Sequence, residues 1–332
     1  MPALRLAILG MEHPHAPGLV EQIAKRPDQF ELVGGFDPAL DVSNQRTEAW
    51  REAFSNFRQF ETAEHLLAAP LDAVVIEGAT EQNVSWARQA LERGRHVLLE
   101  KPAGLNFAEF EAVSQLAQQS GLQLQMLYLF RYMSAVQYLL NAVANNELGH
   151  IYQYRARLPK DYRLYDELVE NYKHLPGGIF FEMACHAIDI MIAALGEPLS
   201  VQSMTRHHGT QSDDFLNNGV AVFEFPNAFG QIEVTALELA SDARRFEVYG
   251  TDGAIVIPNL GSGHLENSQF QTVQHYRSES GWESVDLPAA TLQSADLAEF
   301  HARIVDNKPA EFSAQHDLAV QKWLVQSCGG EP

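Results

Sequence analysis

Short apolar runs alternate with amphipathic segments through the first 125 residues, which is typical of strands and helices that follow one another. Helical periodicity is present at Pro17–Lys25 and Gln82–Arg93, and Asn106 begins a capping-box pattern before a helix that Gly121 ends. Because strands and helices alternate over short connections, we predict right-handed βαβ units in a doubly wound parallel sheet. The apolar runs predicted to be its buried strands are Leu4–Leu9, Phe30–Phe36, Ala73–Ile76, His96–Leu99 and Leu122–Leu127.

The pattern changes after residue 126, where strands no longer alternate with helices. A helix at Ala135–Asn145 precedes a strand at Ile151–Leu158, and an apolar helix spans residues 178–195. Consecutive strands then favour an antiparallel sheet with one covered face. The strand-like runs lie near 199–206, 219–225, 229–238, 244–249 and 268–276, and helices follow near 293–306 and 315–327.

These two patterns predict an α/β fold with two domains. Residues 1–125 are expected to form a Rossmann domain, a doubly wound parallel sheet that binds a dinucleotide. Residues 126–332 are expected to form an α+β domain with a large, mostly antiparallel open sheet, for substrate binding and oligomerisation. The length of 332 residues agrees, at about 100–200 residues for each domain.

The chain is strongly acidic, with 43 Asp and Glu residues against 23 Lys and Arg residues and a formal net charge of −20. Such a surface repels nucleic acid and anionic membranes, because binding a phosphate backbone requires Lys and Arg to displace counterions. The composition, with 46% hydrophobic and 20% charged residues, is that of an ordinary folded protein. We therefore expect a small-molecule substrate, with no nucleic-acid or membrane partner.

The cysteines and the apolar runs favour a cytoplasmic protein. Cys185 and Cys328 are the two cysteines of the sequence, and they form neither a disulfide framework nor a paired metal motif. The longest early apolar run, Leu6–Met11, is shorter than the ~20 residues that span a membrane. It also lacks the basic start and the cleavage site of a signal peptide, so we expect a buried strand there.

The turn after the first strand is where a dinucleotide would place its pyrophosphate on a helix N-terminus. Of the G-x-G-x-x-G pattern only Gly10 is present, because Glu12 and His15 stand where the later glycines would be. We expect Gly10, Glu12, His13 and His15 to contact the cofactor. Asp37, at the end of the second strand, is expected to contact the adenosine ribose and to favour NAD over NADP, whose 2′-phosphate it would repel.

Two alternatives apply to this region. Asp37 can be a turn aspartate before Pro38. The sequence His13-Pro14-His15 resembles the H-x-H zinc ligands of barrel hydrolases, but such a site needs an eightfold barrel, which the antiparallel second half does not supply. We therefore expect no metal and interpret both histidines as polar or anion-contacting residues at a helix start.

Three segments carry motifs of a known family. In Gly94–Pro102 the fourth strand ends in Glu-Lys-Pro. Gly177–Asp189 is similar to a helix with the pattern Gly-Gly…Asp-x-x-x-His-x-x-Asp. Phe246–Gly253 is similar to a strand and turn that come later in the sequences of the same family. Together they resemble the glucose–fructose oxidoreductase, inositol dehydrogenase and MocA (Gfo/Idh/MocA) family over nearly the whole chain. The resemblance implies a Rossmann domain followed by an open-sheet domain.

By position, the resemblance implies that Lys101, Glu182 and His186 act at the substrate. Oxidising an alcohol requires a base for the hydroxyl proton, and a histidine with an ordinary pKa of about 6.5 suits that task. A lysine ammonium can stabilise the developing negative charge on the oxygen. Glu182 lies one helical turn before His186 and can orient its imidazole.

The same residues also have structural interpretations. Lys101 can pair with an acid at a strand end, and Glu182, His186 and Asp189 can form a satisfied polar stripe on an apolar helix. A Glu and a His at i and i+4 can also hold a metal. The presence of both motifs in one chain favours catalysis by Lys101 and His186.

Other segments depart from the family pattern. Where the family has Thr-Pro-Asn-x-x-His after the third strand, this chain has Gly78-Ala79-Thr80-Glu81-Gln82-Asn83. Where the family has Asn-Arg-Arg-Phe, this chain has Leu129-Phe130-Arg131-Tyr132 and keeps one arginine, Arg131. The cofactor-binding residues expected here are Gly78, Ala79, Asn83, Glu100 and Lys101, and the substrate-binding residues are Lys101, Arg131, Tyr162, His174, Glu182 and His186. Aromatic rings and polar side-chain ends suit the binding of a polyhydroxylated ligand. The loop residues Tyr162 and His174 equally suit an ordinary surface loop or an oligomer contact.

We therefore expect an NAD(P)-dependent oxidoreductase that transfers hydride between the nicotinamide and a secondary alcohol of a sugar, polyol or related compound. By the family resemblance it would form a homodimer or homotetramer. One alternative, favoured by Glu12 and His15, is a Rossmann-fold binding or regulatory protein without redox chemistry. Another is a redox-neutral lyase or hydrolase that oxidises its substrate transiently with NAD.

Overall fold

The computed structural model describes residues 2–11, 13–38, 57–161, 169, 172–209, 214–239, 243–260, 270–289 and 293–331. The chain divides into two compact units. The first contains Met1–Tyr128 and Gln293–Leu318, and the second contains Leu129–Leu292 and Ala319–Pro332, so the division falls within the last helix, α10 (Ala314–Ser327). The sequence analysis assigned everything after residue 125 to the second domain, whereas a C-terminal segment groups with the first unit.

The first unit is built on a parallel sheet with the strand order β2–β1–β3–β4–β5. Its strands are β1 (Leu4–Met11), β2 (Phe30–Phe36), β3 (Ala73–Glu77), β4 (His96–Glu100) and β5 (Leu124–Leu127). Its helices are α1 (Ala16–Ala24), α3 (Ala63–Leu67), α4 (Thr80–Glu92), α5 (Phe107–Ser120) and α9 (Ser294–Val305).

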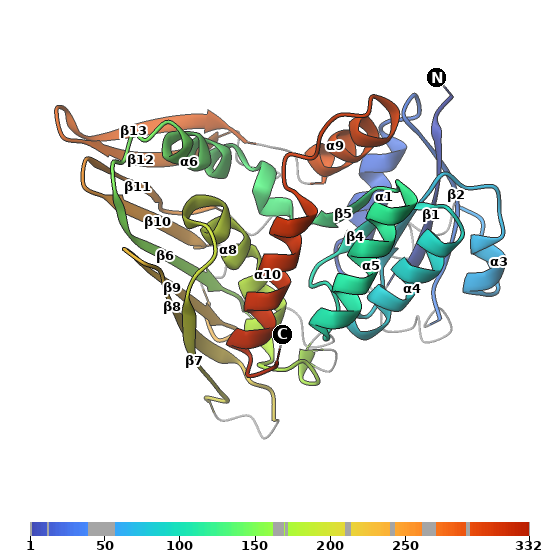
Figure 1. The fold of residues 1–332 in the computed structure, drawn as a ribbon, viewed down its shortest axis with the longest axis horizontal. Helices are drawn as coiled ribbons and strands as arrows, with labels where there is room; N and C mark the ends of the chain where they lie inside the picture. The colour runs from blue at the N-terminus through green and yellow to red at the C-terminus, as the bar shows by residue number, and fades with distance from the viewer. Residues whose placement is uncertain are drawn as a thin grey trace. The chain divides into compact units, whose positions relative to one another are not determined.

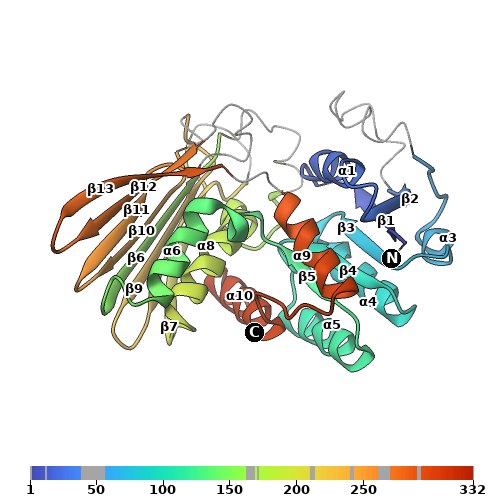
Figure 2. The same ribbon diagram turned by 90° about the horizontal axis from the view of Figure 1, so that it is seen from above.

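Helices cover both faces of this sheet (Figure 2). Helices α1 and α9 pack on one face, where Leu19 and Phe300 join Ile8 and Val75 in one hydrophobic cluster. Helices α4 and α5 pack against each other on the opposite face. Because both faces are covered, all residues of β3 are buried, as the continuous apolar run predicted.

Local signals in the sequence place the helix ends. The Asn106 side chain accepts a hydrogen bond of 3.2 Å from the backbone N–H of Glu109, and Gly121 ends α5 with a φ of 66°. A side chain with a Cβ is disfavoured at that φ, so glycine suits the position. Pro17 is the second residue of α1, and its missing N–H costs nothing in a first turn.

The strand order reverses between β1 and β3, and this reversal positions the first candidate site. In doubly wound sheets, ligands bind outside the carboxyl ends of the strands that flank such a switch point. The residues that follow β1, end β3 and end β4 therefore share the ligand-binding edge of the sheet.

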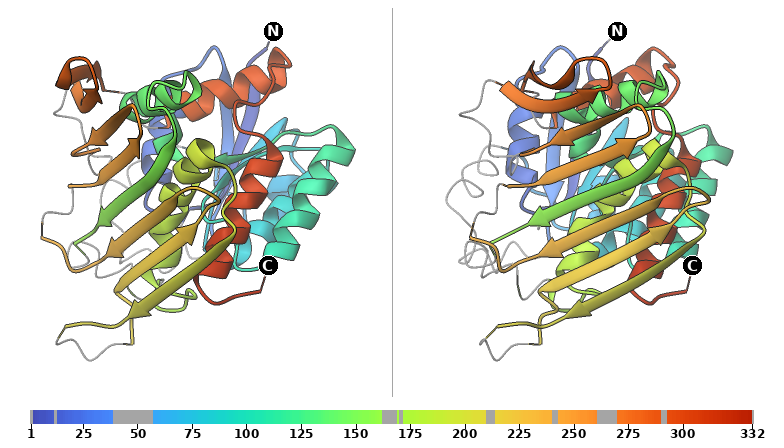
Figure 3. Two further views of the ribbon diagram at one scale, coloured as in Figure 1. Left: turned by 60° about the vertical axis from the view of Figure 1, so that its left-hand side comes forward. Right: turned by 90° about the vertical axis from the view of Figure 1, so that its left-hand side faces the viewer.

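The second unit is built on an eight-stranded sheet with the order β13–β12–β11–β10–β6–β9–β8–β7 (Figures 1 and 3). Its strands pair antiparallel except β6 with β9, which are parallel. They are β6 (Ile151–Pro159), β7 (Ser200–Arg206), β8 (Asn218–Glu224), β9 (Phe229–Thr235), β10 (Arg245–Gly250), β11 (Gly253–Ile257), β12 (Phe270–Arg277) and β13 (Gly281–Pro288). A 3₁₀ helix, η2 (Leu129–Tyr132), precedes α6 (Ser134–Ala144) and α8 (Ile179–Leu195).

Helix α8 covers one face of this sheet and packs against β6, β8 and β9. Along β6, Tyr154, Ala156 and Leu158 are buried while Arg155 is exposed, which is the alternation of a strand covered on one face. Every residue from Ile179 to Ile192 is buried, polar ones included. A charged or titratable residue on α8 is therefore held away from water.

The predicted fold class is confirmed: a doubly wound parallel sheet precedes a large, mostly antiparallel sheet. The sequence analysis missed β11, β13 and the short helix α3. Strand β13 is mostly exposed and polar, so it has no apolar pattern to detect. Within the described ranges, no helix is long and apolar enough to cross a membrane.

Candidate active site

Four side chains converge at the carboxyl edge of the parallel sheet; we call His13, His15, Glu77 and Glu100 the edge cluster. His13 follows β1, His15 precedes α1, Glu77 ends β3 and Glu100 ends β4. His15 Nδ1 lies 3.3 Å from Glu100 Oε2, and His13 Nδ1 lies 3.8 Å from Glu100 Oε1 and 3.6 Å from Glu77 Oε2. The two imidazole rings are 4.4 Å apart, edge to face.

Burial dominates the electrostatics of the edge cluster. Both carboxylate side chains are 0% exposed. Burial raises the pKa of Glu77 to about 8, and the neighbouring Glu100 charge acts in the same direction. Burial lowers the pKa of His15 to about 4, against the opposing charge of Glu100. Burial also raises the pKa of Glu100, but His13 and His15 outweigh it, so that its pKa is lowered overall.

Lys101 directly follows Glu100 and is 2% exposed. Its positive charge lowers the pKa values of both Glu100 and His15. A buried ammonium at the carboxyl edge of the sheet is an electrostatic group available to a ligand that binds there. The predicted residues His13, His15, Glu100 and Lys101 are thus brought together in the first unit.

The turn between β1 and α1 keeps one glycine feature of a dinucleotide site. Gly10 has a φ of 73°, and a Cβ at this position would lie 2.6 Å from Gly78 Cα and 2.4 Å from the Trp86 ring. Gly10 therefore permits the close approach of the turns that follow β1 and β3. Asn83 and Gly78 are buried beside them, and Ala79 precedes the first turn of α4.

These residues fit a dinucleotide in three respects. Helix α1 has no side-chain cap within the described residues, which suits the binding of a phosphate by its first N–H groups. Gly10 allows a close backbone approach. Asp37, 4% exposed, follows β2 directly, where the ribose contact was predicted. Glu12 lies outside the described residues, so its predicted contact stays a prediction.

The second candidate site lies on α8. Glu182 and His186 are 2% and 3% exposed and lie one helical turn apart. The His186 ring stacks on Phe130 of η2, with centroids 4.4 Å apart and an angle of 24°. The Arg244 guanidinium lies 5.5 Å from the centre of the same Phe130 ring. His186 is thus held in one orientation by packing in the second unit.

Arg131, predicted to bind substrate, lies in a buried ion pair. Its Nη2 atom donates to Asp189 Oδ1 at 2.7 Å, and the two side chains are 2% and 1% exposed. Tyr154 donates to the Ala187 carbonyl at 2.9 Å. Burial raises the pKa of Tyr154 well above its ordinary value, and the Asp189 charge adds to this. Asp189 therefore holds Arg131 in place on the polar side of α8.

Two predicted substrate residues are not part of these clusters as described. His174 is exposed, and Tyr162 lies outside the described residues. Their roles, like the other assigned roles, stay predictions. The sequence analysis missed Glu77 and Phe130. Glu77 had a usable signal, since it ends an apolar run in the same way as Glu100, and Phe130 looked like an ordinary core residue.

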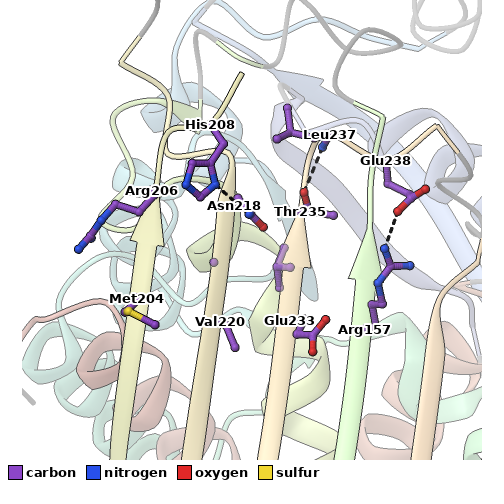
Figure 4. Close-up of a pocket in the computed structure, with 12 residues that line it drawn as sticks. Arg157, Met204, Arg206, His208, Asn218, Val220, Glu233, Thr235, Leu237 and Glu238 are labelled. Atoms are coloured by element: carbon purple, nitrogen blue, oxygen red, sulfur yellow. Dashed lines mark hydrogen bonds and ion pairs between the residues drawn. The ribbon is translucent and has the colours of Figure 1, made fainter. Parts of the chain in front are cut away.

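A separate pocket of about 720 Å³ lies on the face of the eight-stranded sheet opposite α8 (Figure 4). Glu233 and Thr235 of β9 and Asn218 of β8 point into it, and Arg157 of β6 pairs with Glu238 at its rim. Glu182 and His186 do not line this pocket. It contains none of the predicted site residues.

Two family descriptions match the chain. Residues 4–128 match the oxidoreductase family with an NAD-binding Rossmann fold. Residues 136–256 match the GFO/IDH/MocA C-terminal domain.

Several curated proteins are similar in sequence. The scyllo-inositol 2-dehydrogenase (NAD(+)) of Bacillus subtilis is 26% identical over 295 residues, covering 83% of this chain and 81% of that protein. The glucose-6-phosphate 3-dehydrogenase of B. subtilis is 24% identical over 208 residues, covering 61% and 57%. Uncharacterized oxidoreductases of Schizosaccharomyces pombe and Escherichia coli are matched over 47% and 55% of their lengths. The chain thus spans about half the length of several relatives that it matches.

Solved structures share the fold over nearly the whole chain. An oxidoreductase from Thermotoga maritima has a TM-score of 0.81 at 19% identity, covering 98% of this chain and 96% of that one. The WlbA dehydrogenase from Bordetella pertussis, in complex with NADH and UDP-GlcNAcA, has a TM-score of 0.77 at 18% identity, covering 98% and 97%. At such identities the likeness establishes the fold.

Proposed function

Because this chain belongs to the Gfo/Idh/MocA family of NAD-binding oxidoreductases, we propose that it interconverts a secondary alcohol and a ketone on a sugar, polyol or related compound, with NAD as the redox partner. The observation that carries this proposal is the burial of Lys101 at the end of β4, at the ligand-binding edge of a doubly wound sheet. A lysine ammonium at this edge is placed to act on a polar ligand that binds outside the carboxyl ends of the strands.

Lys101, His186 and Glu182 divide the work of the reaction. NAD, when bound, supplies the acceptor for the hydride. The His186 imidazole takes the proton that the substrate hydroxyl loses, and the Lys101 ammonium stabilises the negative charge that develops on the oxygen. Glu182, one turn before His186 on α8, orients the ring, which Phe130 holds from its face.

Gly10, the first turn of α1 and Asp37 would hold the dinucleotide. Gly10 would let the backbone approach the dinucleotide closely, the N-terminus of α1 would bind the pyrophosphate, and Asp37 would accept from the ribose hydroxyls. A carboxylate beside the 2′ position disfavours NADP. His13, His15, Gly78, Ala79, Asn83 and Glu100 border the same edge and complete the proposed cofactor set.

The substrate class rests on chemistry and on relatives. The relatives named above include an inositol dehydrogenase and a sugar-phosphate dehydrogenase. Inositols and sugar phosphates both have a ring that bears several hydroxyl groups. Arg131, Tyr162 and His174 stay proposed substrate contacts. For Arg131 the Asp189 ion pair favours a positioning role.

We also propose a cytoplasmic homodimer or homotetramer. Cys185 and Cys328 do not form a disulfide, which suits a reducing compartment. The face of the large sheet that α8 leaves open carries exposed apolar side chains, including Val222 and Phe229, at 41% and 57% exposure. Association of copies would cover them. Light scattering after size-exclusion chromatography measures the subunit number, and a monomer at micromolar concentration would contradict this part.

The first experiment measures thermal stability with NAD, NADH, NADP and NADPH. A ligand at 100 times its Kd adds about 2.7 kcal/mol, a readily visible shift. We expect stabilisation by NAD and NADH, followed by substrate-dependent NADH absorbance in a screen of polyols, sugars and sugar phosphates. No stabilisation by any of the four dinucleotides would overturn the proposal. Product formation without a lasting absorbance change would indicate the redox-neutral lyase or hydrolase instead.

A further inference from the structure

The edge cluster has an arrangement that a dinucleotide site does not require. Neighbouring parallel strands β1, β3 and β4 end at the same edge, and each supplies a side chain there: His13 just after β1, Glu77 from β3 and Glu100 from β4. His15 joins them from the start of α1. The four residues come from three separate places in the sequence, and the sheet brings them together.

The atoms that face one another in this cluster are metal-ligand atoms. One ligand atom each from His13, His15 and Glu100 lies within 4.8 Å of the others. Each Glu100 oxygen faces a different imidazole, with Oε2 at 3.3 Å from His15 Nδ1 and Oε1 at 3.8 Å from His13 Nδ1. In a tetrahedral zinc site with bonds of about 2.0–2.1 Å, neighbouring ligand atoms are about 3.3–3.4 Å apart. The Glu100–His15 pair is already at this spacing, and the other ligand atoms would have to move closer together by side-chain rotation.

Glu77 is the second, independent observation. Its side chain is 0% exposed and its Oε2 atom lies 3.6 Å from His13 Nδ1. Neither of its carboxylate oxygens has a hydrogen-bond partner among the described residues, and the same holds for Glu100 Oε1. A buried carboxylate normally has an ion or hydrogen-bond donors to replace its lost hydration. The His13 nitrogen that Glu77 faces lies at 3.6 Å, beyond hydrogen-bond distance.

The orientation of His13 also favours a cation between the groups. Its Nδ1 atom accepts a long hydrogen bond of 3.3 Å from the backbone N–H of His15, so this nitrogen has a lone pair. The same nitrogen faces carboxylate oxygens of Glu77 and Glu100, which also carry lone pairs. Lys101 contributes one positive charge near Glu100.

From this geometry we propose that the edge cluster binds one divalent transition-metal ion of the zinc type, with His13, His15 and Glu100 as ligands and Glu77 as the fourth. Two imidazole nitrogens with carboxylate oxygens suit Zn²⁺ or Fe²⁺, whereas Mg²⁺ and Ca²⁺ prefer oxygen ligands throughout. His15, which stands where the third glycine of the G-x-G-x-x-G turn would be, thereby acquires a function of its own. Lys101 and the residues of α8 are not among the proposed ligands, whereas His13, His15 and Glu100 also border the proposed cofactor site.

The test uses the untagged full-length chain, freed of metal with a chelator and dialysed. Zinc binding is titrated calorimetrically, and Co²⁺ replaces zinc as a visible-absorption probe of coordination. We expect one equivalent of Zn²⁺ per chain and the intense visible bands of four-coordinate Co²⁺. His13→Ala and His15→Ala should each weaken zinc binding by at least about tenfold, and Glu77→Gln should do the same if Glu77 is the fourth ligand. The control is His65→Ala, because His65 is exposed on α3 away from the cluster.

Two results would overturn the proposal: no zinc binding by the parent chain at micromolar concentration, or equal binding by the parent chain and both histidine variants. If the alanine variants do not fold, zinc-edge X-ray absorption of the parent chain decides, because the proposal requires two histidine nitrogens and carboxylate oxygen in the first shell. A shell without two nitrogens would overturn it. All these measurements are made without dinucleotide or substrate, so their outcome is independent of the proposed oxidoreductase activity.

Discussion

Arg131 and Asp189 form a two-pronged ion pair in the interior of the second unit. Arg131 Nε lies 3.0 Å from both Asp189 carboxylate oxygens, and Nη2 donates to Oδ1 at 2.7 Å. The pair joins η2 to α8, one turn after His186. An arginine that the sequence placed among substrate ligands thereby has its planar donors committed to an internal carboxylate.

Replacing one member of this ion pair should lower the free energy of unfolding more than replacing both members. Arg131→Met leaves the Asp189 charge buried and unpaired, and we expect a loss of about 3–5 kcal/mol in the free energy of unfolding. The double variant Arg131→Met/Asp189→Leu should recover most of that loss. Urea unfolding followed by circular dichroism measures both. A single variant as stable as the parent chain would show that the pair contributes little.

Lys101 and His186 should be needed for turnover rather than for folding. Lys101→Met and His186→Asn should each lower kcat/KM by at least about 100-fold, because a developing charge or a proton would lack its partner. The matched controls are Lys25→Met and His65→Asn, whose side chains are exposed. The assay is NADH absorbance with the substrate found in the screen. Near-normal activity in both site variants would contradict the assigned roles.

Asp37 should determine the choice of cofactor. Asp37→Ser removes the carboxylate that would face the 2′-phosphate of NADP, a repulsion of about 1 kcal/mol at 4 Å even in water. We therefore expect the ratio of the NAD and NADP affinities to fall by about fivefold or more. Fluorescence titration with NADH and NADPH measures the ratio, with Asp28→Ser, an exposed aspartate, as control. An unchanged ratio would leave Asp37 as a turn residue.

His96 should make stability fall in mild acid. Burial lowers its pKa in the folded state, as does Arg303, while Asp72 opposes them. Below the ordinary pKa of about 6.5, the unfolded chain therefore binds a proton that the folded chain resists, and stability decreases by up to about 1.4 kcal/mol per pH unit from this group. His96 Nδ1 accepts from the Gln123 N–H at 2.9 Å, an acceptor that Asn can replace without titrating. His96→Asn should flatten the stability profile between pH 6.5 and the folded-state pKa, and an unchanged slope would contradict this origin.

The agreement between sequence and structure is closest where the chain is locally periodic. The continuous apolar run at Ala73–Ile76 and the Asn106 cap each determine a local structure by themselves, and β3 and α5 lie where these signals placed them. Strand β13 could not be found this way. Its side chains alternate without a buried apolar face, and it is held by backbone pairing with β12.

By itself, the sequence determined most of the elements, the fold class and the family, because apolar periodicity and the Glu-Lys-Pro and Gly-Gly motifs are local properties of the chain. Only the tertiary structure decided which polar groups meet. Glu77 ends an apolar run like Glu100, which places it at the edge of the sheet but does not show which side chains it meets there. It joins His13 and His15 because β1 and β3 are neighbours at the switch point of the sheet. In the same way Arg131 became the partner of Asp189, because a buried charge requires an opposite charge wherever the fold brings one.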